Sequence, residues 1–400
     1  MTISEETQRA YVPKEMLKEL GHVKNSLQIG IPCESDPEKR LPITPEAVGL
    51  LTDCGHRIIL QAGAGLGMKY ADNNFSEMGA SIVDSPAEVF QADIILKITP
   101  PSPEEVALMR PRTILFSMLQ MNYFAMEAYS HILSKRISAF GYELIVDNFG
   151  NQPIRSLISE IDGMMAITIA SELLTNKQDG KGILLGGIPG VPATEIVILG
   201  AGRASMMACM SAIALGAQVK VFDSDICKLR QLQDSVGQKV FTSNFHPNVL
   251  RNAMRSADVV IGALHNDNCR HHFVISDELI CGMKKGAIII DLETNEGGCF
   301  ETTCNRSLSM PEVFERYGVR HYCRPNLSNY VARTTSIALS NILVPILMSV
   351  GEQASINGAV KADEYLRSGV YVYHGKPVND YVSNHFNIRS SNLDIYLSAF

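Results

Sequence analysis

Residues 195–223 read Glu-Ile-Val-Ile-Leu-Gly-Ala-Gly-Arg-Ala-Ser-Met-Met-Ala-Cys-Met-Ser-Ala-Ile-Ala-Leu-Gly-Ala-Gln-Val-Lys-Val-Phe-Asp. The apolar run at 196–199 is typical of a buried parallel strand, which needs no alternation because both of its faces are covered. Gly-Ala-Gly follows at 200–202, then a helix of small residues to about Leu215, and a second apolar strand that ends on Asp223. This order is that of a βαβ unit with the dinucleotide-binding fingerprint.

The fingerprint predicts a nucleotide site of a particular kind. Gly200 permits the tight turn, and Gly202 lets a pyrophosphate approach the start of the helix. Asp223 is placed to bind ribose hydroxyls, which favours NAD over NADP because a 2′-phosphate would be repelled; Lys228 nearby weakens this preference. Ser205 replaces the third glycine of the fingerprint and is small enough to be tolerated. We predict an NAD site, with a βαβ unit that has lost its ligand as the alternative.

The overall composition is that of an ordinary globular protein of about two domains. The chain has 400 residues, of which 46% are hydrophobic and 19% charged, and a net charge of −7 without a basic cluster, so nucleic-acid binding is not expected. We find no run of 18 apolar residues and expect no membrane span. Residues 1–24 are polar and predict a helical or frayed extension rather than a signal peptide. The odd count of nine cysteines fits a reducing cytoplasm.

Two further clusters predict no ligand. Residues 265–272 carry three histidines and one cysteine (His265, Cys269, His271 and His272), but their spacing matches no common zinc site, and we expect a polar loop and no metal. Residues 63–67 have the glycine content of a phosphate loop, yet no matching acidic residue follows their downstream strand, and we predict a turn.

Strands and helices alternate on both sides of the fingerprint. Before it, the patterns predict strands at 27–32, 57–61, 92–98, 113–118 and 137–142, and helices at 45–53, 72–78, 103–109 and 123–134. After it, they predict helices at 226–236, 247–256 and 276–283, and strands at 240–242, 258–263, 287–292 and 319–323. Long apolar helices at 159–174 and 331–350 would connect two domains, and the tail would be helical, then irregular, with a short hairpin near 371–377. The fold class is therefore α/β, with two Rossmann-like doubly wound domains.

Short motifs from residue 29 onwards resemble, in order, those of the alanine dehydrogenase and nicotinamide nucleotide transhydrogenase family. They are Ile-Gly-Ile-Pro-Cys-Glu (29–34), Arg40 with Ile-Thr-Pro (43–45), Gln-Ala-Gly-Ala-Gly (61–65), Ile-Leu-Lys-Ile (95–98), Gly-Ile-Pro-Gly-Val (187–191), Gly-Ala-Gly (200–202) and Glu-Gly-Gly-Cys-Phe-Glu (296–301). The last motif, and the lack of accompanying membrane segments, place the resemblance nearer to the soluble alanine dehydrogenases.

The resemblance implies both an architecture and a reaction. It implies a discontinuous substrate domain (1–158 with 331–400), an inserted NAD-binding domain (159–330), a cleft between them and a cytoplasmic homohexamer. The reaction would be the reversible, NAD-dependent oxidative deamination of L-alanine, or a similar small amino acid, to pyruvate and ammonia. Arg40 matches the family cation that holds the substrate carboxylate, and a bidentate fork suits that group. Asn326 matches an asparagine near the nicotinamide, and Ser159 and Leu264 match cofactor positions.

Three ionisable family residues are replaced in this sequence. The family lysine corresponds to Thr99, with Lys97 two residues earlier; the family histidine corresponds to Gln120; and the family aspartate corresponds to Asn295. Glutamine and asparagine do not titrate near neutrality. The three replacements can therefore still form hydrogen bonds, but they cannot transfer protons as the ionisable family residues would.

Two hypotheses about activity follow from these replacements. In the first, the enzyme is active: Lys97 lies on the same strand face as Thr99 and partly replaces the missing lysine, and Glu143 or Glu293 supplies an acid. In the second, the chain is an NAD-binding homologue that is non-catalytic or uses another substrate, and acts as a sensor or assembly partner. Lys97 could equally be the partner of a structural carboxylate.

Overall fold

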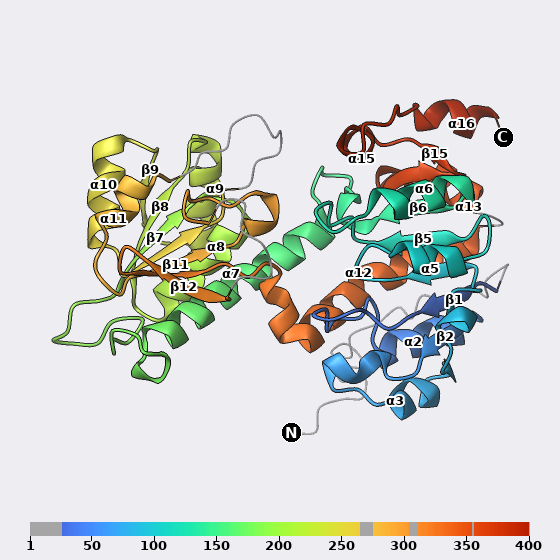
Figure 1. Ribbon diagram of the computed structural model, residues 1–400, viewed down its shortest axis with the longest axis horizontal. Coiled ribbons are helices and arrows are strands. Elements are labelled where there is room, and N and C mark those ends of the chain that lie inside the picture. The colour runs from blue at the N-terminus through green and yellow to red at the C-terminus, as the bar shows by residue number, and fades with distance from the viewer. Residues whose placement is uncertain (1–25, 265–274, 304–310, 354–355, 400) are drawn as a thin grey trace, which may run out of the picture.

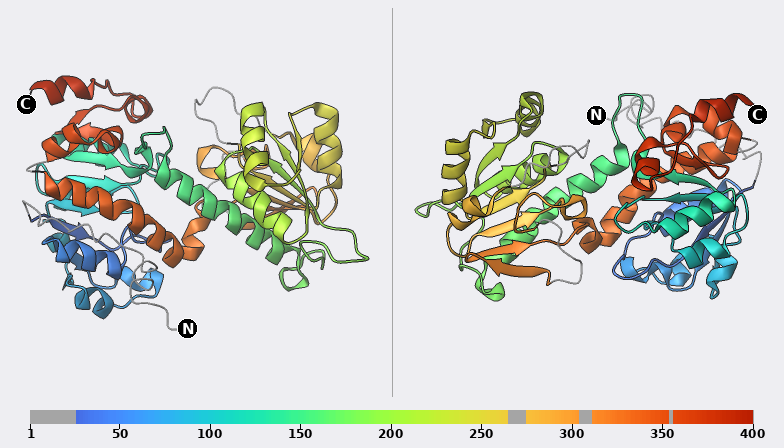
Figure 2. Two further views of the ribbon diagram at one scale, coloured as in Figure 1. Left: turned by 180° about the vertical axis from the view of Figure 1, so that it is seen from behind. Right: turned by 45° about the horizontal axis from the view of Figure 1, so that its top comes forward.

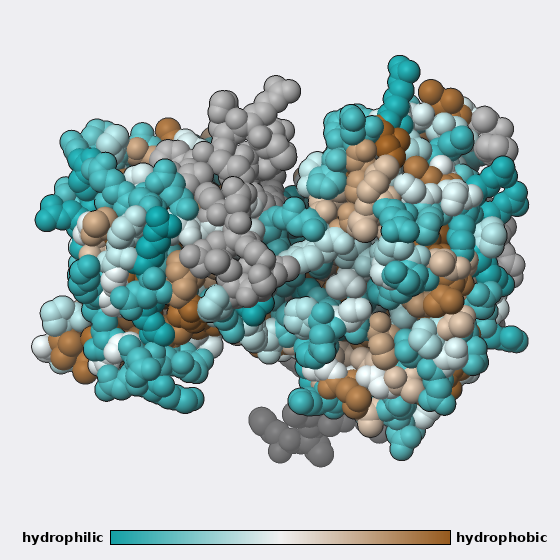
Figure 3. Space-filling model, in the orientation of Figure 1, coloured by the Kyte–Doolittle hydropathy of each residue, from teal (hydrophilic) through white to brown (hydrophobic). Residues whose placement is uncertain are grey.

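The computed structural model describes residues 26–264, 275–303, 311–353 and 356–399. It has two lobes, each built around a mainly parallel sheet and covered by helices (Figure 1). The face shown in Figure 3 is largely polar, with apolar residues scattered over it. The predicted N-terminal extension and the histidine- and cysteine-containing loop at 265–272 lie outside the described residues.

The first lobe contains an eight-stranded sheet in the order β15-β14-β6-β5-β4-β1-β2-β3. The chain enters it at β1, moves outwards through β2 and β3, and then crosses back to β4, so the strand order reverses between β1 and β4. Only β14 and β15 are antiparallel to their neighbours. The strands are β1 (Gln28–Ile31), β2 (Arg57–Gln61), β3 (Ser81–Val83), β4 (Ile94–Leu96), β5 (Ile114–Ser117), β6 (Ser138–Gly141), β14 (Val370–Tyr373) and β15 (Lys376–Pro377).

The helices of this lobe start where the sequence has caps and prolines. Thr44 accepts a hydrogen bond from the backbone N–H of Ala47, and Pro45 occupies the first helical position, as predicted. Ser102 and Glu105 form a capping box. The helices are α2 (Pro45–Asp53), α3 (Asp72–Glu77), α4 (Pro86–Val89), α5 (Pro103–Leu108), α6 (Met126–Ser134), α13 (Ile356–Ala362), α14 (Glu364–Ser368), α15 (Asp380–His385) and α16 (Leu393–Ala399).

The second lobe contains a seven-stranded sheet in the order β12-β13-β11-β10-β7-β8-β9, which reverses between β7 and β10. Its strands are β7 (Glu195–Leu199), β8 (Gln218–Phe222), β9 (Phe241–Ser243), β10 (Val259–Gly262), β11 (Ile288–Asp291), β12 (Val313–Arg316) and β13 (Val319–Tyr322). Its helices are α8 (Arg203–Ala214), α9 (Ile226–Val236), α10 (Pro247–Ser256) and α11 (Asp277–Cys281). The predicted α/β class with two doubly wound sheets is confirmed.

Two long helices meet between the lobes and contact each other over part of their length (Figure 2). They are α7 (Pro153–Leu174) and α12 (Ala332–Glu352). The segment Leu327–Glu352 is long and apolar enough to cross a membrane by length and composition alone, a test that the core helix of a globular protein also passes. Half of its most apolar window is buried inside the fold, where Leu339, Leu343 and Leu347 join the core of the first lobe.

Several local predictions were wrong. Helix α7 begins at Pro153 rather than at residue 159, because proline suits the first helical turn. The patterns missed β3, α4 and β12, each only three or four residues long. The tail beyond the hairpin forms α15 and α16 rather than irregular structure. Residues 64–68 of the predicted turn form a short 3-10 helix, η1 (Ala64–Met68).

Candidate active site

The glycine turn after β7 leaves open space beside the backbone. Gly200 has φ +105°, and a Cβ there would lie 2.2 Å from the carbonyl oxygen of Ala263 after β10. Gly202, in contrast, has no atom within 4 Å of the position of a Cβ. Gly202 is also the N-cap of α8, with no side-chain cap. The first amides of this helix therefore start beside open space, and unpaired amides at a helix start are the groups that bind anions in proteins.

Asp223 holds the glycine turn in place. Its carboxylate accepts hydrogen bonds from the backbone N–H groups of Ala201, at 2.6 Å, and Asp225, at 2.8 Å. The group is 8% exposed, at the carboxyl end of β8 and beside the turn that follows β7. Lys228 is exposed on α9, and its backbone N–H donates a hydrogen bond to the side chain of Asp225. The fingerprint thus has its predicted geometry, and Asp223 also has a structural role that the sequence did not indicate.

The other predicted cofactor residues come from separate elements of the second lobe. Leu264 follows β10 and donates its backbone N–H to the sulfur of Cys299 at 3.4 Å. Asn326 has left-handed backbone angles (φ 58°, ψ 55°) at the start of η5 (Leu327–Val331). Ser159 lies on the part of α7 before Gly163. Gly163 approaches α8 so closely that a Cβ would lie 2.1 Å from the carbonyl oxygen of Ala204, so a glycine on α7 permits the close packing of these two helices.

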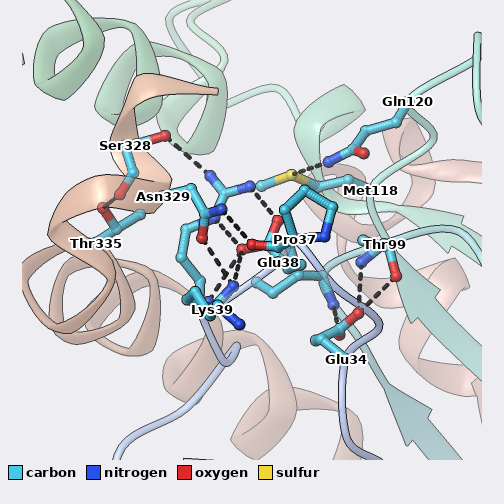
Figure 4. Close-up of polar contacts among 12 residues, drawn as sticks. Glu34, Pro37, Glu38, Lys39, Thr99, Met118, Gln120, Ser328, Asn329 and Thr335 are labelled. Atoms are coloured by element: carbon cyan, nitrogen blue, oxygen red, sulfur yellow. Dashed lines mark hydrogen bonds and ion pairs between the residues drawn. The ribbon is translucent and has the colours of Figure 1, made fainter. Parts of the chain in front are cut away.

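Arg40, the predicted carboxylate-binding residue, is engaged by an internal carboxylate. Its Nε and Nη2 donate to the two oxygens of Glu38 at 2.7 and 2.6 Å, and its Nη1 donates to the hydroxyl of Ser328 at 2.9 Å. Arg40 is 1% exposed. Burial lowers its pKa, but Glu38 outweighs this and leaves the pKa raised. The guanidinium of Arg40 therefore has internal partners in Glu38 and Ser328, both of which are labelled in Figure 4.

Lys97 and Thr99 both interact with carboxylates at the carboxyl end of β4, of which Glu34 is buried and Glu105 partly exposed. The ammonium of Lys97 lies 2.6 Å from Glu105 and 3.8 Å from Glu34. The hydroxyl of Thr99 donates to Glu34 at 2.5 Å, and Glu34 also accepts the backbone N–H of Thr99. Burial raises the pKa of Glu34, and the charge of Lys97 opposes this. The geometry matches the alternative in which Lys97 is the partner of structural carboxylates.

Gln120 and Asn295 lie on loops that contact each other across the lobes. The hydroxyl of Tyr123, three residues after Gln120, donates to the side-chain oxygen of Asn295 at 3.1 Å, and the side chain of Asn122 donates to the backbone carbonyl of Asn295. Gln120 has φ 37° and places its amide nitrogen 3.9 Å from the sulfur of Met118, a weak contact. The loops after β5 and β11 are thus joined by hydrogen bonds between the two lobes.

Two carboxyl groups near these loops have a strongly raised pKa. Burial raises the pKa of Glu143 to about 7, although Glu143 accepts the backbone N–H of Leu119 at 2.5 Å. Burial also raises the pKa of Asp162 on α7 to about 6, opposed by the backbone N–H of Ser328, which donates to it at 2.6 Å, and by the charge of Arg40. Glu143 was among the acids expected from the sequence, whereas Asp162 was not. An aspartate within an apolar helix was the available signal.

The other acid predicted from the sequence, Glu293, donates its backbone N–H to Asp291 at 3.0 Å. Its negative charge contributes to the raised pKa of Asp162. Within the described part of the chain, no group of three or more histidine, cysteine or acidic side chains is arranged to hold a metal ion.

Comparisons with known proteins agree with this geometry. The model of the alanine dehydrogenase/PNT N-terminal domain matches residues 30–161, and that of the C-terminal domain matches residues 166–380. An alanine dehydrogenase of Bacillus subtilis is 32% identical over 351 residues, which cover 87% of this chain and 91% of that protein. An alanine dehydrogenase of Staphylococcus epidermidis is 30% identical over 92% of this chain and 99% of its own.

Solved structures extend the likeness to three dimensions. An L-alanine dehydrogenase superimposes with a TM-score of 0.83 at 29% identity, over 90% of this chain and 99% of that one. A transhydrogenase from Sinorhizobium meliloti shares the fold, with a TM-score of 0.75 at 24% identity, over 88% of this chain and 100% of that one. The chain belongs to the alanine dehydrogenase/PNT family, on its alanine dehydrogenase side, and is an alanine dehydrogenase-like oxidoreductase.

Proposed function

We propose that this protein binds NAD in the crevice between β7 and β10 and transfers hydride between NAD and a small amino or oxo acid, with L-alanine as the first candidate. The observation that carries the proposal is the open space beside Gly202, next to the carboxylate of Asp223. In doubly wound sheets, ligands bind at the carboxyl ends of strands where the strand order reverses. When bound, NAD supplies the hydride acceptor; the protein supplies orientation and proton transfer.

The neutral side chains of Thr99, Gln120 and Asn295 cannot move the reaction's protons. We assign that role to Asp162, whose pKa of about 6 lies near physiological pH. Asp162 accepts the backbone N–H of Ser328, and the hydroxyl of Ser328 accepts from Arg40, so the three groups link both lobes at one point. Glu143, with a pKa of about 7, is the second candidate acid.

A second candidate function is nucleotide binding without turnover. It is favoured because Arg40 pairs with Glu38 and Lys97 pairs with Glu105, so both cations assigned to the substrate have internal partners. Such a homologue would act as a sensor or an assembly partner. The two candidates share the nucleotide crevice and differ in whether a proton carrier faces the substrate.

The cofactor proposal is tested by comparing Gly202→Ala with the unchanged protein. A Cβ at Gly202 meets no protein atom, so the variant should fold with a melting temperature no lower than that of the unchanged protein. The same methyl group would occupy the space proposed for the pyrophosphate, and the affinity for NADH, measured by fluorescence titration, should fall at least tenfold. Equal NADH affinity in the two proteins would refute the proposed location. NADP binding as tight as that of NAD would contradict the role of Asp223.

Turnover is tested by following NADH absorbance with NAD and a panel of small amino acids. We expect activity with L-alanine or a close relative, and a loss of about 10²-fold or more in kcat for Asp162→Asn. Asp162→Glu should retain part of the activity and shift the acid limb of the pH profile. Absence of turnover with every amino acid, while NADH still binds, would select the non-catalytic candidate. Unchanged kinetics in Asp162→Asn would remove that residue from the mechanism.

The same proposal includes a substrate domain at 1–158 with 331–400 and an NAD-binding domain at 159–330. It also includes a homohexamer and a cytoplasmic location. The domain limits are supported by the two sheets, since the first takes strands from 28–141 and 370–377 and the second from 195–322. Light scattering of the purified protein would measure the hexamer, and a mass of one subunit, 43.8 kDa, would contradict it.

A further inference from the structure

A cavity of about 530 Å³ lies on the first lobe, at the other end of its strands from the candidate active site. Its lining includes Arg112, two residues before β5, and Arg136, two residues before β6, whereas Gln120 lies beyond the opposite end of β5. At about 3.3 Å per residue, the four residues of β5 separate the two sites by roughly 13 Å. The remaining walls come from the end of α6, from the β14–β15 turn and from α13 and α16.

We propose that this cavity binds a phosphate-bearing small molecule, at a site separate from the nucleotide and amino-acid sites. Three cationic side chains line it: Arg112, Arg136 and Lys376. No acidic side chain is among the described lining residues, and none of the three cations forms an ion pair within the described ranges. Uncompensated positive charge is notable in a chain of net charge −7. Arginine forks and lysine ammonium groups are the usual phosphate ligands of proteins.

Polar side chains on the cavity wall hold one another in position. The hydroxyl of Tyr373 donates to the side-chain oxygen of Asn357 at 2.8 Å, and Nε2 of His374 lies 2.8 Å from the same oxygen. The ring of Tyr396 belongs to the lining as well. A cavity of this volume lies within the range of about 300–1,000 Å³ typical of small-molecule sites, so it can hold a sugar phosphate or a mononucleotide.

The backbone around the cavity is held in an unusual conformation. Arg112, Arg136 and His374 have φ values of 68°, 57° and 46°, in the left-handed region that non-glycine residues rarely adopt. Such conformations persist only where the surroundings impose them, and they concentrate at functional sites. Gly375 contributes to this packing, because a Cβ there would lie 2.4 Å from the carbonyl oxygen of Leu133. The turns thereby keep both arginines at the rim of one cavity.

The test is calorimetric titration of the full chain carrying Gly202→Ala, so that the nucleotide crevice does not contribute. The probes are inorganic phosphate, ribose 5-phosphate and AMP, with ribose and adenosine as uncharged counterparts. We expect the phosphorylated probes to bind at least tenfold more tightly than their counterparts. Arg112→Gln with Arg136→Gln should weaken binding by a further tenfold or more. The control pair Arg57→Gln with Arg255→Gln, arginines outside the cavity, should leave affinity unchanged.

Three results would overturn the proposal. The first is that no phosphorylated probe binds. The second is that the cavity double variant and the control pair bind the probes with equal affinity. The third is that the double variant forms an assembly of lower mass although neither protein binds an anion. The last result would show that the cavity is an interface between copies of the chain. Lys376→Gln, on the exposed β15, provides a second variant if the double substitution does not fold.

Discussion

Glu143 shows how burial sets the chemistry of a single residue. Its side chain accepts the backbone N–H of Leu119, immediately before Gln120, while its second oxygen is buried without a hydrogen-bond partner in the described structure. A carboxylate in this position has lost much of its hydration, so the protonated form is favoured and the pKa rises to about 7. The group is therefore neutral over much of the pH range in which a free glutamate is charged.

This shift predicts a pH-dependent stability. Below about pH 4.5 the carboxyl is protonated in both states; between pH 4.5 and 7 only the unfolded state loses its proton, so stability falls as pH rises. Glu143→Gln does not titrate, so its stability relative to the unchanged protein should rise by about 3 kcal/mol from pH 4.5 to 8. Urea unfolding at several pH values measures this. The exposed control Glu77→Gln should show no such trend, and a flat difference for Glu143→Gln would refute the raised pKa.

The sequence identified the residues at the motif positions but not their partners. Arg40, Lys97 and Thr99 were singled out through the resemblance of their motifs to a family, and in the structure Lys97 and Thr99 follow β4 while Arg40 lies in the loop before α2. Glu38 and Glu105 lie two and eight residues from the cations that they pair with, and side-chain pairing of this kind depends on where the backbone turns. Asp162 could not be assigned because Ser328, its hydrogen-bond donor, is 166 residues away.

At the level of elements, the packing of α7 on α8 positions the nucleotide crevice. A Cβ on Gly163 would lie 2.1 Å from the carbonyl oxygen of Ala204, in the first turn of α8. The sequence predicted both helices, because their apolar runs are long, but not this contact, which depends on how they cross. Short elements such as β3 and α4 were missed for a related reason: three or four residues carry too little pattern, and neighbouring strands determine their conformation.

Gly163→Ala should consequently separate the two helices. The obstruction is backbone rather than a movable side chain, so we expect destabilisation of more than about 1 kcal/mol, typical of overpacking, and weaker NADH binding because the glycine turn precedes Ala204 directly. Gly282→Ala is the matched control, since its Cβ would have only contacts of 3.5 Å or longer. Thermal unfolding and NADH titration measure the two effects. A Gly163→Ala variant as stable as the control would show that the helices adjust freely.

At the scale of the whole molecule, the two lobes contact each other through loops and η5 rather than through their sheets. The loop after β5 reaches the loop after β11 through Tyr123 and Asn295, and Arg40 reaches η5 through Ser328. Doubly wound order in each sheet could be predicted from alternating patterns. The contacts between the sheets could not, because they depend on how α7 and α12 cross between the lobes. These contacts bring together positions that are far apart in the chain.

The same arrangement predicts that alanine dehydrogenase chemistry can be strengthened in this scaffold. The family positions regain their ionisable groups in a triple variant that carries Thr99→Lys, Gln120→His and Asn295→Asp. The new lysine would lie beside the buried carboxylate of Glu34, which accepts a hydrogen bond from the hydroxyl of Thr99 at 2.5 Å. We expect kcat/KM for L-alanine to rise about 10²-fold or more, because a general acid–base group contributes that much. NADH formation measures the change, and adding Gly202→Ala to the triple variant should remove it. A triple variant that folds and binds NADH but gains no activity would show that these three loops do not meet around the substrate, and that Asp162 or another group has replaced their chemistry rather than supplemented it.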